Sequence, residues 1–300
     1  MSMKQTVKNN AKNAMRTKYG RSIVMIMLLM GINILFYLMD AIITQAMRMP
    51  VFDNVEAGIT PSLIQNINLS TPLIVGNIVI VISYFLVMAP LYYGASGWFY
   101  RVIGGQNCEI ASAFNFFESA KLMLKSWGTG LNLLIRKIFY LALFSLPGAA
   151  IAAVGEYYKV LSLGDSDHRR YVLAISIKGL GLCLLVVAFI CAFIYFKKYS
   201  VVKYLLNEDK NIKIGQAIRL SSKITKEQKA KIAAFDFSFI GWFILCVLII
   251  PVLYVSPYYM TSKALYSKVL IERYYMEHPF SNDEIKSEDE TKEQSDDISL

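Results

Sequence analysis

Four ionisable side chains lie inside or close to long apolar stretches of this 300-residue sequence, and they are its best candidates for chemistry. They are Asp40, Lys178, Asp236 and Lys263. A charged group within hydrocarbon is costly, so it usually pairs with another group or lines a polar path. These residues therefore predict either an intramembrane ion pair or a polar path through a helical bundle.

Asp236 and Lys263 form the candidate intramembrane pair. They flank a turn expected near Pro251, with 15 residues on one side and 12 on the other. At the helical rise per residue, the two depths are about 22 and 18 Å, within one helical turn of each other. The alternative is that Lys263 extends to the inner headgroups, while Asp236 caps a helix or meets lysines of a surface helix.

Asp40 and Lys178 lie towards the outer ends of two other apolar stretches. Side chains at such positions commonly reach the outer headgroups. The alternative is a polar path in which Asp40, Lys178 and Asp236 occupy different depths of the bundle.

Catalytic and metal-binding motifs are missing from the sequence. It contains no phosphate-binding GxxxxGK[ST] loop, no HExxH, no GxSxG and no Rossmann glycine fingerprint. The two histidines, His168 and His278, stand in separate polar segments, and none of the four cysteines belongs to a CxxC pair. We therefore expect a non-enzymatic protein without a metal or another cofactor.

The elements that position these residues are transmembrane helices. The chain is 55% hydrophobic and 18% charged, with a mean hydropathy of +0.43, and it contains repeated apolar stretches of about 20 residues. This composition predicts an all-α, polytopic helical membrane protein with one transmembrane domain over 22–276. Five spans are clear and the last is marginal: about 22–46, 73–96, 135–154, 175–196, 232–250 and 252–271.

The charge distribution predicts the orientation of these spans. Residues 1–21 contain six basic residues and no acid, which predicts an interfacial helix on anionic headgroups. The connectors 97–134 and 197–231 are also basic, which places them and the N-terminus in the cytoplasm of a cell-membrane protein. An excess of Lys and Arg in these segments is typical of cytoplasmic loops and does not indicate nucleic-acid binding.

The C-terminal residues 277–300 have the opposite charge. They carry nine acids and two lysines, a net charge of −7, so the rest of the chain carries +16 against +9 overall. Such a segment is expected to be a disordered cytoplasmic tail. It would solvate the protein and mask the basic connectors, or it would dock a basic cytoplasmic partner.

Two pairs of segments suggest an internal repeat. EIASAFNF (109–116) and KIGQAIRL (213–220) share a pattern that predicts short amphipathic helices on the cytoplasmic surface. APLYYGASGWFYRVI (89–103) and SPYYMTSKALYSKVL (256–270) share a proline, a following tyrosine and a basic end. Because 89–103 ends a span at the cytoplasmic side, its likeness favours 252–271 as a sixth span. If 252–271 is instead a surface helix, five spans remain and the tail lies outside.

Several segments resemble a bacterial multi-pass membrane family known only as domain of unknown function 975. DFSFIGWFILCVLII (236–250) with SPYYMTSKALYSKVL, YSVVKYLLNEDKNIKIGQAIRLSSKI (199–224) and KNNAKNAMRTKYGRSI (8–23) carry the resemblance. The family has Pro-Gly shortly before the Tyr-Ser of the fourth span, where this chain reads CAFIYFKKYS. The resemblance implies a cell-membrane protein and no particular activity.

Two functions agree with these features. The first is a non-enzymatic scaffold, accessory or regulatory membrane component with a cytoplasmic or membrane protein partner. The second is a small transporter, export or immunity component that handles an amphiphile or lipid. A membrane-depth cavity lined by Asp236 or Asp40 would favour the second, and a tightly packed bundle would favour the first.

Overall fold

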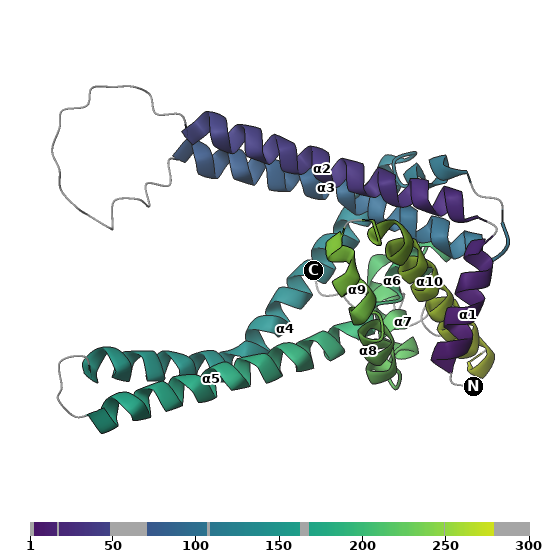
Figure 1. Cartoon of the computed structure of the whole chain (residues 1–300). Helices are drawn as coiled ribbons and strands as arrows, with labels where there is room; N and C mark the ends of the chain where they lie inside the picture. The colour runs from purple at the N-terminus through teal and green to yellow at the C-terminus, as the bar shows by residue number, and fades with distance from the viewer. Residues whose placement is uncertain are drawn as a thin grey trace, which may run out of the picture.

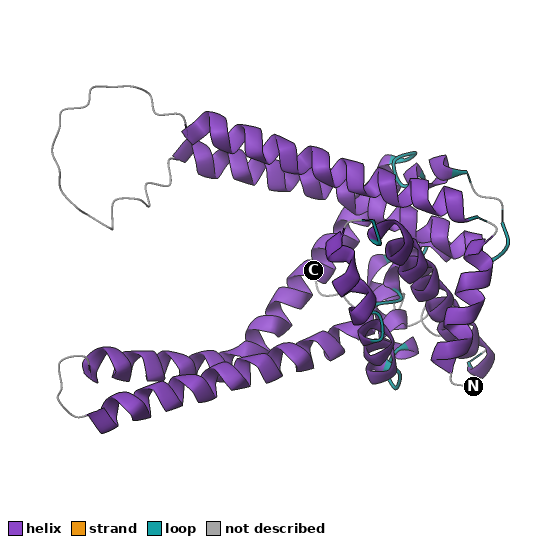
Figure 2. Ribbon diagram, viewed as in Figure 1, coloured by secondary structure: helices purple, strands orange, loops and turns teal. Residues whose placement is uncertain are grey.

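The structure, a computed structural model, describes residues 3–16, 18–48, 71–106, 109–162, 168–248 and 250–278. Within these ranges every element is a helix (Figure 2). The elements are α1 (Met3–Arg16), α2 (Tyr19–Arg48), α3 (Thr71–Ile103), η1 (Ile110–Phe114), α4 (Ala120–Leu161), α5 (His168–Tyr195), η3 (Phe196–Tyr199), α6 (Val202–Glu208), α7 (Ile214–Ile224), α8 (Lys229–Phe237), α9 (Ile240–Leu245), η4 (Cys246–Leu248) and α10 (Val252–Glu277).

Two long helical hairpins extend from a packed helical core. Helix α2 pairs with α3, and α4 pairs with α5 (Figure 1). Large apolar side chains on these hairpins are exposed, including Ile42 at 67% and Phe139 at 63%. Exposed apolar surface over whole helices is typical of segments that face lipid.

Five segments are long and apolar enough to cross a membrane, which confirms a polytopic helical protein. They are Tyr19–Gln45, Ile74–Ile103, Ala120–Leu161, Arg169–Glu208 and Lys229–Leu248. The five clear spans expected from the sequence fall on these segments. Helix α10 is continuous, but it does not belong to this group by hydropathy.

The fifth of these segments is not a single helix. Helix α8 ends at Phe237, and α9 begins at Ile240. The intervening Ser238 donates its hydroxyl to the Phe235 carbonyl at 2.5 Å, a local bond that competes with the helical pattern. The interruption begins two residues after Asp236, so Asp236 stands at the end of a short helix rather than inside a long one.

The core lies where the hairpins converge. Trp98 and Phe99 of α3 pack there with Tyr204 of α6, Phe235 of α8 and Ile271 of α10, and all five are at most 1% exposed. Helices α1, α6, α7, α8 and α10 surround this core (Figure 1). The inner ends of the long hairpins are thereby held together by short helices.

Helix α1 packs on the protein itself. Its apolar residues Val7, Ala11 and Met15 are at most 4% exposed, and the helix lies along α10. Lys8 Nζ lies 4.3 Å from the centre of the Phe239 ring. Partial burial lowers the pKa of the Lys8 ammonium, and the neighbouring Lys4 adds to this effect. The apolar side of α1 is therefore covered by protein.

The repeated segments both contribute buried residues to the protein interior, although their equivalent residues lie in different hydrophobic clusters. Ala113 of η1 and Ala217 of α7, which are equivalent in the alignment, are both fully buried. Phe116 and Leu220, also equivalent, are each 2% exposed. Both segments thus bury the apolar face that their sequence pattern predicts. The acidic tail beyond His278 lies outside the described residues.

Candidate functional site: a lysine cluster around Asp236

Asp236 is the centre of a buried polar cluster. Its side chain is 7% exposed, and Oδ2 accepts hydrogen bonds from Lys263 Nζ at 3.3 Å and from Lys197 Nζ at 2.6 Å. Tyr259 donates its hydroxyl to Oδ1 at 3.1 Å. The structure therefore brings the two members of the sequence-derived pair together and adds a second lysine and a tyrosine.

Aromatic packing fixes the elements that carry these groups. Asp236 lies in the last turn of α8, where Phe235 stacks near Tyr266 of α10 with ring centres 4.9 Å apart. Phe239 contacts Tyr259 edge to face, with ring centres 5.2 Å apart. These contacts hold α8 beside α10 and place Asp236 opposite Lys263.

Lys197 is a site residue that sequence reasoning missed. It lies in η3, directly after the apolar run of α5, within the segment 197–231 that the charge pattern predicts to be a cytoplasmic connector. Its side chain is only 11% exposed, and its Nζ lies 3.7 Å from the centre of the Phe193 ring. The available signal was the sequence IYFKKYS, in which aromatic residues surround two lysines at the end of a span.

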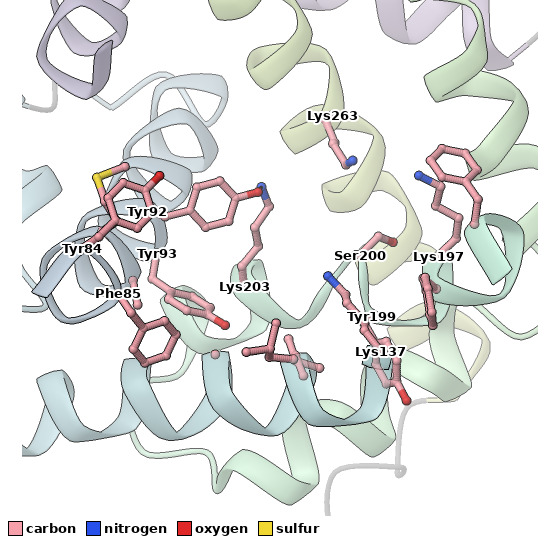
Figure 3. Close-up of a pocket in the computed structure, with 17 residues that line it drawn as sticks. Tyr84, Phe85, Tyr92, Tyr93, Lys137, Lys197, Tyr199, Ser200, Lys203 and Lys263 are labelled. Carbon is pink, nitrogen blue, oxygen red and sulfur yellow. The ribbon is translucent and has the colours of Figure 1, made fainter. Parts of the chain in front are cut away.

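A cavity of about 570 Å³ opens beside this cluster (Figure 3). Lys197 and Lys263 reach it, and Lys137 of α4 and Lys203 of α6 also line it. Lys203 Nζ donates to the Tyr92 hydroxyl at 2.9 Å. We name this site the lysine pocket: Lys137, Lys197, Lys203 and Lys263 with the aromatic and aliphatic residues around them.

The apolar part of the lysine pocket comes from the two hairpins. Its residues on α3 and on the α4–α5 hairpin are Tyr84, Phe85, Met88, Ala89, Leu133, Leu134 and Phe193. Gly130 allows α4 to approach α3, since a Cβ there would lie 3.2 Å from the Phe85 ring. The pocket therefore has three lysines on the core elements η3, α6 and α10, a fourth on the hairpin helix α4, and an apolar side towards the exposed hairpins.

Lys178 and Asp40 do not join this cluster. Lys178 pairs with Glu156 of α4 at 2.5 Å, and both side chains are more than a third exposed. Asp40 of α2 has no ion-pair partner among the described residues. Within the described part of the chain, Asp40, Lys178 and Asp236 make no ion pairs or hydrogen bonds with one another, so these contacts do not connect them into a polar path.

The arrangement can hold a negative charge but offers no obvious nucleophile. Asp236 is engaged with three donors, and ammonium groups at the cavity surface are suited to electrostatic recognition of an anion. No curated protein and no solved structure matches this chain. A family model described as a protein of unknown function, DUF975, matches residues 1–274, so the chain belongs to this family of proteins of unknown function.

Proposed function

We propose that this chain is a non-enzymatic accessory or scaffold protein of the bacterial cell membrane, with both termini in the cytoplasm. The observation that carries the proposal is the position of the core. It joins the two hairpins with exposed apolar surfaces, α2–α3 and α4–α5, at one end (Figure 1). This core includes the basic N-terminal helix α1 and the segments α6 and α7 of the second basic connector. Basic segments next to membrane helices usually remain in the cytoplasm.

The end of α10 supports a cytoplasmic C-terminus. Leu270 and Tyr274 of α10 line a groove together with Lys223 and Ile224 at the end of α7. Because α7 belongs to the basic connector, the last turns of α10 lie on the same side of the membrane as that connector. The tail that follows would begin at this face.

The start of α10 favours a hairpin that enters and leaves at the inner face, rather than a complete sixth crossing. The ring of Tyr254 lies 6.1 Å from that of Tyr19, the first residue of α2. Pro251 is three residues before Tyr254, or about 5 Å along the helix. A complete crossing would require about 30 Å of hydrocarbon between Pro251 and the inner face.

The residues at the tip of this hairpin suit insertion into the inner leaflet. Val247, Leu248 and Ile250 are 82%, 69% and 80% exposed, and no charged residue lies between Asp236 and Lys263. Exposed apolar residues of this kind are stabilised by lipid. We therefore favour four complete crossings, α2 to α5, followed by a hairpin formed by α8, α9, η4 and α10.

Topology reporters test this arrangement. Fusions after Leu206 and after Leu300 should both report the cytoplasm, and reports from opposite sides would overturn the proposed orientation. A single cysteine at Ile250, in a variant with the four native cysteines replaced by serine, should resist an impermeant maleimide added to intact cells. A cysteine at Ser166, between α4 and α5, is the positive control. Labelling at both positions would instead support six crossings.

The scaffold role is tested through the exposed basic face of α1. Lys12 and Arg16 are exposed, whereas Val7 and Ala11 anchor the helix to α10. K12E/R16E should leave the protein in the membrane while removing a stoichiometric partner recovered by affinity purification. Deleting 280–300 tests the tail in the same assay. An unchanged partner set in both variants would contradict the scaffold role.

Handling of an anionic amphiphile is the second candidate function. The lysine pocket favours it, because a cavity lined by the two lysines that contact Asp236 lies beside apolar hairpins.

A further inference from the structure

We propose that the lysine pocket binds the phosphate group of an anionic amphiphile, with the beginning of its hydrocarbon chain against the apolar side of the pocket. This inference concerns a ligand and does not depend on the scaffold role.

The first argument is an excess of positive charge. Lys137, Lys197, Lys203 and Lys263 come from four different elements, α4, η3, α6 and α10 (Figure 3). None of the 17 residues that line the cavity is acidic. Among the described residues, Asp236 is the one acid in ion-pair contact with these lysines. Within the described part of the chain, no second acid forms an ion pair with Lys137 or Lys203.

The second argument is that these charges act on the same space. The Tyr92 hydroxyl accepts a hydrogen bond from Lys203, and it also interacts electrostatically with Lys137 and Lys263. Lys197 in turn experiences the charges of Lys137 and Lys263. Like charges repel strongly where water is partly excluded, so an anion between them would remove an unfavourable interaction.

The third argument is the geometry of the donors. Each ammonium group has three donors and acts as a compact point charge on a flexible stem. Ammonium groups that approach from several directions fit the oxygens of a phosphate better than the two oxygens of a single carboxylate. Basic pockets between membrane helices at the cytoplasmic side are typical sites for phosphate headgroups.

The fourth argument is the apolar side of the pocket, which favours an amphiphile over a soluble phosphate. Phe85, Met88 and Leu133 line the cavity, and Leu134 is 48% exposed at its edge. The cavity of about 570 Å³ lies within the range that holds a headgroup-sized ligand. A hydrocarbon chain bound there would continue along the lipid-facing hairpin, where a soluble phosphate would leave apolar surface uncovered.

Binding to the purified full-length protein tests the inference. The probes are dioleoyl phosphatidic acid, zwitterionic dioleoyl phosphatidylcholine, glycerol 3-phosphate and inorganic phosphate, measured by native mass spectrometry and by competition with fluorescent phosphatidic acid. We expect phosphatidic acid to bind in preference to phosphatidylcholine. K137Q should weaken phosphatidic acid binding about tenfold, because a charge-assisted hydrogen bond is lost. K137R should restore most of the affinity.

Two further variants serve as controls: K226Q tests for attraction to basic surface in general, and A89F separates a lipid from a soluble phosphate. K226Q removes one exposed lysine outside the pocket, and it should change the affinity less than twofold. A89F fills the apolar side without changing the charge, and it should weaken phosphatidic acid binding while leaving weak glycerol 3-phosphate binding unchanged. Each variant is accepted only if its melting temperature in detergent is close to that of the wild type.

Three results would overturn the inference. Equal binding of phosphatidylcholine and phosphatidic acid would exclude recognition of a net anionic phosphate headgroup. Equal loss in K226Q and K137Q would show attraction to basic surface in general. The third result is that inorganic phosphate or glycerol 3-phosphate competes as strongly as the lipid does, and that A89F does not change this competition. It would assign the pocket to a soluble phosphate compound instead of an amphiphile.

Discussion

Lys197 Nζ lies 2.6 Å from Asp236 Oδ2, closer than the 3.3 Å of Lys263 Nζ, although 39 residues separate Lys197 from Asp236 along the chain. One carboxylate thus joins η3, α8 and α10. Because both the Asp236 and the Lys197 side chains are largely buried, this contact is protected from the screening that weakens surface ion pairs.

D236N should strongly destabilise the protein. The substitution leaves Lys197 and Lys263 facing each other without a carboxylate, and breaking a buried pair from one side costs about 3–5 kcal/mol. The thermal unfolding midpoint of the purified protein in detergent measures the effect. D40N is the matched control, since Asp40 has no ion-pair partner among the described residues, and its midpoint should stay near that of the wild type. Equal midpoints for D236N and wild type would contradict the structural role of the cluster.

Y259F should have a smaller effect. The Tyr259 hydroxyl donates to Asp236 and accepts from Lys263 at 2.9 Å. Its removal breaks both hydrogen bonds and should lower the free energy of unfolding by about 1 kcal/mol in total. Y258F removes a hydroxyl of the adjacent residue whose bond to the Lys8 carbonyl is long, at 3.5 Å. The thermal unfolding midpoint should therefore be higher for Y258F than for Y259F, and higher for both variants than for D236N. A midpoint for Y258F below that of Y259F would argue against the cluster.

Gly181 should be essential for the α4–α5 hairpin. A Cβ at Gly181 would collide with the backbone of Ala152, and one at Gly155 would collide with the backbone of Lys178. G181L should separate the two helices and destabilise the protein by about 1–3 kcal/mol or more. Gly179 has nothing within 4 Å of an added Cβ, so G179L is the control. Folded protein recovered after detergent extraction, measured by size-exclusion chromatography, should fall for G181L alone.

Gly94 should be equally restrictive at the junction of α3 with η1. An added Cβ would collide with the Ala113 carbonyl, whose residue is fully buried. G94A should therefore lower the thermal midpoint and expose η1 to proteolysis. G31A places the same methyl group in open space on α2, and its midpoint should be unchanged or slightly higher, because Ala favours helix more than Gly does. Wild-type stability in G94A would show that η1 can move away from α3 without loss.

The candidate site was partly predictable. Asp236 and Lys263 could be paired because distances along two adjacent helices follow from residue numbers and a fixed rise per residue. Lys197 could not be added in this way, since its approach to Asp236 depends on how α5 packs against α8. The Glu156 partner of Lys178 required the register of the α4–α5 hairpin, which Gly155 and Gly181 set through close backbone contact.

By itself, the sequence determined the helical membrane class, the five apolar segments and the basic character of the segments that join the core. These properties depend on the length of apolar runs and on local charge, which any fold of this chain would retain. The tertiary structure decided which surfaces those segments cover. It buried the apolar stripe of α1 against α10, placed Tyr254 beside Tyr19, and brought four lysines from four elements around one cavity. Contacts between distant segments depend on side-chain packing in three dimensions, and neither hydropathy nor periodicity records that packing.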